Sequence, residues 1–219
     1  MADRSRSNAT QVYHKICEEM IIAIVRGVAP STVVSIAEAL HSGGVHLVEV
    51  TCNTPGAVEM IGEVSRAMSD RMIVGAGTVI TEDMARRVHQ AGAKYVIAPD
   101  VNPDVIRYCT NHDIAVIPGA ATATEVLTAH RLGVPMVKIF PAAALGVDYI
   151  EQLRGPIDNV DFIAVGGITA GNVGDFVRAG CAGAGLGGSL IKKDLVANSD
   201  WAGLTELAQK VRTAATLCA

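Results

Sequence analysis

Short runs of apolar, often β-branched residues alternate with amphipathic helical segments along nearly the whole 219-residue chain. Such runs are typical of buried parallel strands, and a strand followed by a helix, repeated many times, predicts a parallel α/β fold. No Pro- or Ser-rich linker interrupts the alternation after residue 20. We therefore expect one domain over residues 1–219, in which residues 1–19 form an N-terminal extension or helix.

The number of strands decides between two architectures. Eight strands are predicted, near residues 20–26, 47–51, 72–78, 95–99, 114–119, 136–140, 161–167 and 183–188. Helices are predicted near residues 32–42, 54–68, 82–91, 102–111, 121–132 and 172–179, several of them ending at a glycine. Eight strands, each followed by a helix, predict a (β/α)8 TIM barrel, with a doubly wound sheet of fewer central strands as the alternative. The helical spacing of Val12, Ile16 and Glu19 predicts a short helix that closes the bottom of the barrel.

The composition limits the kinds of partner. Hydrophobic residues make up 50% of the chain and charged residues 18%, which suits a large core and excludes a disordered chain. The net charge of −4 and the aromatic content of 4% favour neither a basic surface nor a stacking platform for nucleic acid. No apolar run reaches the ~18 residues that a membrane helix needs. We therefore expect a small-molecule partner, with no nucleic acid and no membrane.

Cysteine and histidine usage predicts neither a disulfide framework nor a metal site. The 5 cysteines are widely spaced without a C-x-x-C pair, and the 6 histidines form no H-E-x-x-H motif. The polar start of the chain carries no apolar signal region. We expect reduced thiols, a cytoplasmic location, no metal and no cofactor, and we interpret Cys52 as a small packing residue.

Lys138 is the residue that most strongly indicates chemistry, because it stands inside an apolar strand that alternation divides into two faces. In barrels of this kind the active site lies at the C-terminal ends of the strands. Burial of an ammonium group lowers its pKa and produces a nucleophilic amine at neutral pH. Such an amine can attack a ketone to give a Schiff base, which then accepts electrons when a carbon–carbon bond breaks. The structural alternative is a lysine at the barrel rim in an ion pair with Glu49.

Glu49 also lies inside an apolar strand, where alternation places it on one face with Leu47 and Thr51. A carboxylate in such a place requires a partner. Together with Lys138 it could accept and return the protons that imine formation and carbon deprotonation require, directly or through one water. We therefore predict that Glu49 is the general acid and base.

Two glycine motifs predict a phosphate site. The segments VGGIT at 165–169, with Gly166 and Gly167, and GLGGS at 185–189, with Gly187, Gly188 and Ser189, close the seventh and eighth predicted strands. Barrels frequently bind phosphate there, because loop amides and a short helix N-terminus donate hydrogen bonds and glycine lets the backbone approach closely. Other residues at strand ends could line a substrate pocket: Arg26, Thr51, Thr78, Pro99 and Phe140.

Taken in order, these motifs resemble a known family, the class I aldolases for 2-keto-3-deoxy-6-phosphogluconate (KDPG) and 4-hydroxy-2-oxoglutarate (KHG). The resemblance covers about residues 12–215 and rests on AIVRG at 23–27, EVT at 49–51, GAGTV at 75–79, AP at 98–99, PG at 118–119, VKIFP at 137–141, GGI at 166–168 and GGS at 187–189. It implies that Lys138 forms the Schiff base, that Glu49 is the general acid and base, that Thr78 positions the pyruvate part and that Arg26 is the family's active-site arginine. It also implies a homotrimer without a metal and a phosphate cradle made of Gly166, Gly167, Gly187, Gly188 and Ser189.

Two positions depart from the gluconate-type pattern. Enzymes of that type often carry an arginine four residues after the catalytic glutamate, which holds the pyruvate carboxylate, where this chain has Asn53. They also commonly read Thr-Gly-Gly where this chain has Val165 before the two glycines. Asn53, Val165 and the stretch 121–125 are more similar to the galactonate-type aldolase, which acts on the C4 epimer.

The expected reaction is reversible cleavage of KDPG to pyruvate and glyceraldehyde 3-phosphate, or of KHG to pyruvate and glyoxylate, and the galactonate-type aldolase is the alternative. Two alternatives belong to other classes: a phosphate-binding barrel isomerase or synthase that uses no imine, and a barrel that binds a phosphorylated acid without turnover. The expected small-molecule partners are a phosphorylated keto acid and pyruvate.

Overall fold

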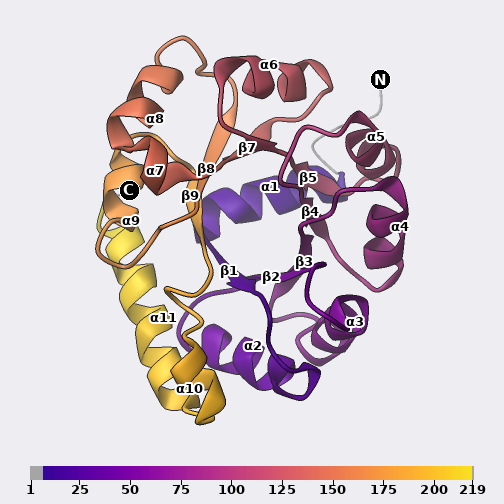
Figure 1. The fold of residues 1–219 in the computed structure, drawn as a ribbon, viewed down its shortest axis with the longest axis vertical. Helices are drawn as coiled ribbons and strands as arrows, with labels where there is room; N and C mark the ends of the chain where they lie inside the picture. Colours follow the sequence, from indigo (N-terminus) through magenta and orange to yellow (C-terminus); the bar gives the residue numbers. More distant parts are fainter. Residues whose placement is uncertain (1–6, 219) are drawn as a thin grey trace.

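Parallel strands form a barrel at the centre of the computed structural model, which describes residues 7–218 (Figure 1). The strands are β1 (Ile21–Val25), β2 (Leu47–Thr51), β3 (Ile73–Gly77), β4 (Tyr95–Ile97), β5 (Ala115–Ile117), β6 (Gly119–Ala120), β7 (Met136–Ile139), β8 (Asp161–Val165) and β9 (Gly183–Leu186). Their order in the sheet is β5-β4-β3-β2-β1-β9-β8-β7-β6. The predicted TIM barrel is confirmed.

The helices surround the strands, with α1 lying behind them across one end of the barrel in Figure 1. They are α1 (Asn8–Glu19), the 3-10 turn η2 (Pro30–Thr32), α2 (Val33–Ser42), α3 (Ala57–Ala67), α4 (Glu82–Gln90), α5 (Pro103–Asn111), α6 (Ala123–Arg131), α7 (Ala142–Leu145), α8 (Val147–Arg154), α9 (Val173–Arg178), α10 (Lys193–Ala197) and α11 (Trp201–Thr216). Of the expected N-terminal extension, residues 1–6 lie outside the described residues.

The fifth strand differs from the prediction. One strand was expected over residues 114–119, but Pro118 divides it into β5 and β6, because proline has no N–H to donate to a neighbouring strand. β5 pairs with β4 and β6 pairs with β7, so the two ends of the sheet are joined through Pro118 itself. The Lys138 N–H donates to the Pro118 carbonyl at 2.9 Å, which holds β7 against this junction and closes the barrel.

Alternation along the strands separates two apolar clusters. Val48, Val50 and Val137 belong to the cluster between the strands and the surrounding helices. Leu47 and Met136 belong to the cluster inside the barrel, which also contains Val12 and Ile16 of α1. Because successive residues of a strand point to opposite faces, Glu49 and Lys138 point into the barrel. α1 fills one end of the interior, and the polar residues lie toward the other.

The helix starts follow capping side chains. Thr81 and Asn102 accept hydrogen bonds from the first turns of α4 and α5. Thr122 and Glu125 form a capping box, so α6 begins at Ala123 rather than at residue 121 as predicted. Each strand was expected to be followed by one helix, but two helices, α7 and α8, follow β7, and two, α10 and α11, follow β9.

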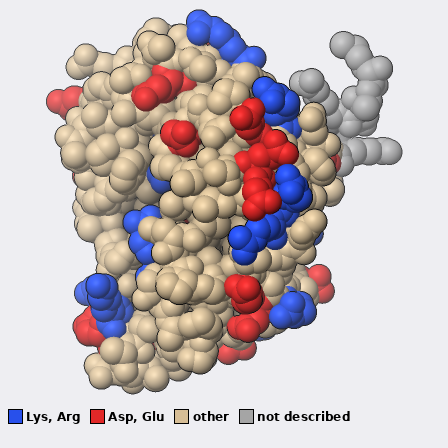
Figure 2. Space-filling model, turned by 45° about the vertical axis from the view of Figure 1, so that its right-hand side comes forward, with Lys and Arg blue, Asp and Glu red and all other residues tan. Residues whose placement is uncertain are grey.

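Acidic and basic side chains lie next to one another on the face drawn in Figure 2. The ion pairs on α4 and α5 show the same intermixing, since Arg86 contacts Glu82 and Asp83, and Arg107 contacts Asp104. Such a surface has no large field of one sign that would attract a polyanion. No helix in the described part of the chain is long and apolar enough to cross a membrane.

Candidate active site

A cavity of about 470 Å³ opens at the C-terminal ends of the strands, which is where a barrel carries its active site. The residues that line it come from both halves of the barrel and include Lys138 and Glu49. The structure brings together nearly all of the predicted site residues. The lining residues are Ile24, Arg26, Glu49, Asn53, Thr78, Pro99, Lys138, Phe140, Val165, Gly166, Gly167, Ile168, Thr169, Gly185, Gly187, Gly188 and Ser189.

Lys138 reaches the cavity from the inner face of β7 and is 7% exposed. Burial lowers the pKa of its amine, the charge of Glu49 raises it, and the charge of Arg26 lowers it again. The amine lies 4.9 Å from the centre of the Phe140 ring. Since burial is the largest of these effects, the amine is more easily deprotonated than an ordinary lysine, as a nucleophile requires.

Glu49 reaches the same cavity from the inner face of β2 and is 2% exposed. Burial raises the pKa of its carboxyl group to about 7, against the opposing charges of Lys138 and Arg26. A carboxyl group with a pKa near neutrality can both accept and return a proton at physiological pH. Among residues 7–218, no ion pair within 4 Å joins it to Lys138, so the two groups interact through the field between them and not as a salt bridge.

Glycine at position 77 provides the space that Glu49 occupies. A Cβ atom at Gly77 would lie 1.5 Å from Oε1 of Glu49. The carboxyl group therefore leans over β3, and any side chain at this position would displace it.

Three polar residues stand around the mouth of the cavity. Arg26 and Asn53 are exposed, and Thr78 is half-buried with a φ of 56°, in the left-handed region that few threonines adopt. Of these three, Arg26 alone carries a charge and could pair with a substrate carboxylate, whereas Asn53 can offer hydrogen bonds only. Phe140 is 44% exposed and Pro99 is exposed, so both present apolar surface to the cavity.

The two glycine motifs meet on one side of the cavity. Gly166 and Gly167 have φ values of 96° and 75°, which glycine adopts without strain. A Cβ atom at Gly188 would meet nothing within 4 Å, so this segment faces open space. The Ser189 hydroxyl donates to the Ile168 carbonyl at 2.6 Å and ties the two motifs together. Backbone surrounds a small open region here, as a phosphate site requires.

Thr51 is the predicted site residue that does not line the cavity. Its side chain is fully buried, and its hydroxyl lies 3.1 Å from that of Thr54 and 3.4 Å from the Val25 carbonyl. The Thr54 hydroxyl in turn accepts from the Gly27 N–H. Thr51 therefore fastens the loop after β2 to the end of β1, and it is not among the residues that line the cavity.

Four lining residues were not predicted as site residues, Ile24, Gly185, Ile168 and Thr169, although the last three lie within the two glycine motifs. Ile24 lies beside Glu49 in the strand register, so alternation along β1 could have found it. Thr169 ends the first glycine motif and Gly185 begins the second, so the motifs already marked both positions.

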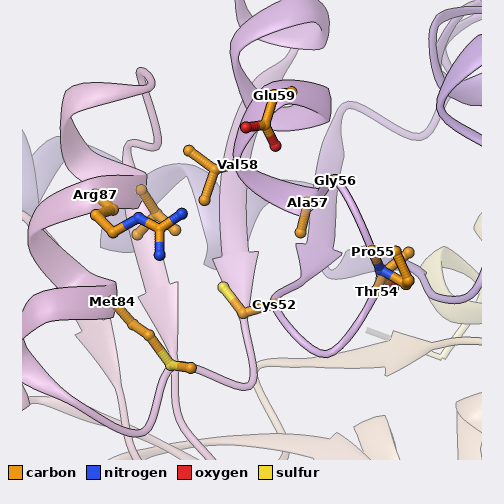
Figure 3. A pocket seen from close by; sticks show the side chains of 10 residues that line it. Cys52, Thr54, Pro55, Gly56, Ala57, Val58, Glu59, Met84 and Arg87 are labelled. Atoms are coloured by element: carbon orange, nitrogen blue, oxygen red, sulfur yellow. The ribbon is translucent and has the colours of Figure 1, made fainter.

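A second cavity, of about 260 Å³, lies between α3 and α4 outside the barrel (Figure 3). The Cys52 thiol and the Arg87 guanidinium both border it. Burial, with the charge of Glu49, raises the pKa of the Cys52 thiol to about 11, and Arg87 opposes the rise. The thiol therefore stays protonated and unreactive at neutral pH, as expected of a packing residue. No group of three His, Cys, Asp or Glu side chains within residues 7–218 could hold a metal ion.

Comparison with known proteins places this geometry in a family. Residues 12–207 match the family described as KDPG and KHG aldolase. The chain is 35% identical to the 2-dehydro-3-deoxy-6-phosphogalactonate aldolase of Escherichia coli over 173 residues, which are 78% of this chain and 84% of the relative. It is also 35% identical to the 2-dehydro-3-deoxy-phosphogluconate aldolase of Treponema pallidum over 178 residues, 81% of this chain and 84% of the relative.

A solved structure supports the same assignment. The KDPG aldolase of Legionella pneumophila, with pyruvate captured as a covalent carbinolamine intermediate, superposes with a TM-score of 0.83 at 30% identity, covering 88% of this chain and 93% of that one. The family match spans most of the chain, and both curated relatives exceed 30% identity. The chain therefore belongs to the KDPG and KHG aldolase family and is a lyase.

Proposed function

We propose that this aldolase cleaves a 2-keto-3-deoxy-6-phospho sugar acid, with KDPG as the first candidate, to pyruvate and glyceraldehyde 3-phosphate through an imine on Lys138. The observation that carries the proposal is the buried lysine, whose pKa is lowered, facing a buried carboxyl group across one cavity. The relative from Legionella, captured with pyruvate as a covalent carbinolamine, supports it.

One group, Glu49, carries the proton in several steps of the proposed reaction. The neutral amine of Lys138 attacks C2 of the keto acid, and Glu49 gives a proton to the departing hydroxyl as the iminium forms. Glu49, now ionised, takes the proton of the C4 hydroxyl while the C3–C4 bond breaks and its electrons move into the iminium. The aldehyde leaves, and Glu49 returns its proton to C3 of the enamine. Water then adds to the iminium and gives a proton back to Glu49, and collapse of the carbinolamine frees pyruvate and the neutral amine of Lys138.

The cavity offers separate partners for the two anionic ends of such a substrate. Arg26 can pair with the carboxylate, and Asn53 can add a hydrogen bond. The backbone around Gly166, Gly167, Gly187 and Gly188, with Ser189, can cradle the phosphate. A cavity of about 470 Å³ is within the range that holds a small ligand.

The galactonate epimer is the second candidate, and Val165 favours it. Val165 is 5% exposed and lines the cavity, where it can offer no hydrogen bond to a substrate hydroxyl. Asn53 also lines the cavity in the place where gluconate-type enzymes often carry an arginine. The test is pyruvate release from the two C4 epimers at equal concentration. Faster cleavage of KDPG supports the first candidate, and equal or faster cleavage of the galactonate epimer supports the second.

Chemical trapping tests the imine. We expect borohydride with pyruvate to attach a reduced three-carbon adduct to Lys138, located by peptide mass spectrometry, and to leave folded Lys138→Met unmodified. An isomerase or synthase without an imine predicts instead that Lys138→Met keeps its activity. Unmodified Lys138 in folded wild-type protein would contradict the proposed mechanism.

A further inference from the structure

Tyr95 is a second polar side chain buried inside the barrel next to Glu49, and the proposed reaction does not use it. It lies on β4, is fully buried, and belongs to the apolar cluster inside the barrel. Buried tyrosines usually find a hydrogen-bond partner for the hydroxyl. The presence of a buried hydroxyl group at this position therefore requires an explanation.

The strand register places Tyr95 and Glu49 at one level of the barrel. Glu49 on β2 pairs with Gly75 on β3, and Gly75 pairs with Tyr95 on β4. Neighbouring strands lie about 4.8 Å apart, so the two Cα atoms are about 10 Å apart with only a glycine between them. Two long side chains can meet across that distance.

Both side chains lean toward β3. A Cβ atom at Gly75 would lie 2.3 Å from the Tyr95 ring, and one at Gly77 would lie 1.5 Å from Oε1 of Glu49. Ala76, between the two glycines, belongs to the outer cluster, so both glycines face the interior. The ring therefore lies over Gly75 and the carboxyl group over Gly77, at successive inward-facing positions of the same bare stretch of strand.

A polar atom at the end of each side chain lacks a hydrogen-bond partner in the described part of the chain. Oε2 of Glu49 and the Tyr95 hydroxyl are both buried, and neither makes a hydrogen bond within residues 7–218. Polar atoms buried in this way are costly unless they are bonded, and one interior water with two such neighbours can satisfy both. The hydroxyl can only donate to a carboxylate, because burial and the charge of Glu49 hold the pKa of Tyr95 well above its usual value.

We propose that Tyr95 is a positioning residue for Glu49, whose hydroxyl donates through one interior water to the carboxylate oxygen that has no protein partner. This inference rests on the proposed function, because Glu49 must be the proton carrier. The other titratable groups that interact electrostatically with Glu49 are Lys138 on β7, Arg26 after β1 and Cys52, whose thiol borders the cavity outside the barrel. Lys138 and Arg26 already favour the ionised form of Glu49, and Tyr95 adds a hydrogen bond.

The test is Tyr95→Phe, which keeps the ring against Gly75 and removes only the hydroxyl. The assay is exchange of the pyruvate methyl protons with D₂O, followed by NMR, because this exchange uses the imine and the proton carrier without aldehyde. A hydrogen bond to the ionised carboxyl group lowers its pKa, so its loss raises that pKa. We expect the acidic limb of the rate profile to move up by about half a unit to one unit. We expect kcat below that limb to fall about fivefold, with the plateau rate and KM unchanged.

The matched control is Tyr149→Phe. The Tyr149 hydroxyl donates to the Ala121 carbonyl at 2.6 Å outside the barrel, so its loss should leave the profile of the exchange reaction where it is in wild type. Wild-type protein that exchanges no protons would contradict the proposed function itself. Active wild-type protein with an unmoved acidic limb in Tyr95→Phe would overturn the role of Tyr95, and so would a uniform loss of rate at every pH, which indicates packing alone.

Discussion

A single methyl group at Gly77 should disable the proposed chemistry by moving Glu49. The Cβ atom of an alanine there would lie 1.5 Å from Oε1, 2.3 Å from Cδ and 2.7 Å from Cγ of Glu49. Non-bonded heavy atoms of this kind settle at about 3.5 Å, so the carboxyl group must retreat by roughly 2 Å. Gly77 is the last residue of β3 and is paired with Thr51, so the backbone has little freedom to yield instead.

Two magnitudes follow for Gly77→Ala. Overpacking of a buried site costs about 1–3 kcal/mol of unfolding free energy. Displacement of a catalytic group by ~1 Å can cost about 100-fold in rate, so we expect kcat for substrate cleavage to fall at least about 100-fold. The loss of rate should greatly exceed the loss of stability, because the clash is directed at one functional side chain.

The assay combines steady-state cleavage with a double-mutant cycle on stability. In the Glu49→Ala background an alanine at 77 no longer meets the carboxyl group, so its cost in unfolding free energy should largely disappear. Gly155→Ala is the matched control, since a Cβ atom there comes no closer than 3.5 Å to another atom and the position lies after α8. An equal cost of Gly77→Ala in both backgrounds, or a kcat within about fivefold of wild type, would refute the reasoning.

Three further predictions concern the carboxyl group, the arginine and the phosphate cradle. Burial raises the pKa of Glu49 from 4.5 to about 7, so between these values the folded chain retains a proton that the unfolded chain has lost. The unfolding free energy should therefore fall by up to about 3 kcal/mol as pH rises through that window, and urea titrations of Glu49→Gln should lack this part of the slope. Arg26→Ala should raise KM for pyruvate in the proton-exchange assay about tenfold or more, with little change in Tm. An unchanged KM would contradict the role of Arg26 and indicate that backbone amides bind the pyruvate carboxylate. Gly188→Ala should raise KM for the phosphorylated substrate but not for 4-hydroxy-2-oxoglutarate, because the new methyl group enters the open space of the cradle; equal effects on both would place the phosphate elsewhere.

The sequence predicted those parts of the site that depend on one strand at a time. Alternation along β2 and β7 put Glu49 and Lys138 on the faces of Leu47 and Met136, and both of these residues lie in the inner cluster. The ends of the strands followed from the apolar runs, so the cavity could be located at the correct end of the barrel. These inferences succeed because the period of a strand is fixed by its backbone geometry.

What the sequence did not predict depends on contacts between segments. Alternation assigned Thr51 to the pocket, but its hydroxyl bonds to Val25 and Thr54, and the residue does not line the cavity. Pro118 was visible in the sequence, yet its effect on pairing depends on β4 and β7, which lie on either side of it. Tyr95 was not singled out in the sequence, because nothing near it reveals that a glycine, Gly75, lies opposite it on β3.

The inner face of β3 explains why the site needs a strand with few side chains. That face carries Gly75 and Gly77, and a glycine inside a strand is less favourable than alanine by roughly 0.5–1 kcal/mol. Side chains at these two positions would overlap the Tyr95 ring and the Glu49 carboxyl group, which fill the space that the two glycines leave open. The two glycines thus let a carboxyl group with a pKa near neutrality reach the cavity that Lys138 faces. The chemistry that we assign to Glu49 on β2 and Lys138 on β7 therefore depends on β3, which carries no side chain at positions 75 and 77.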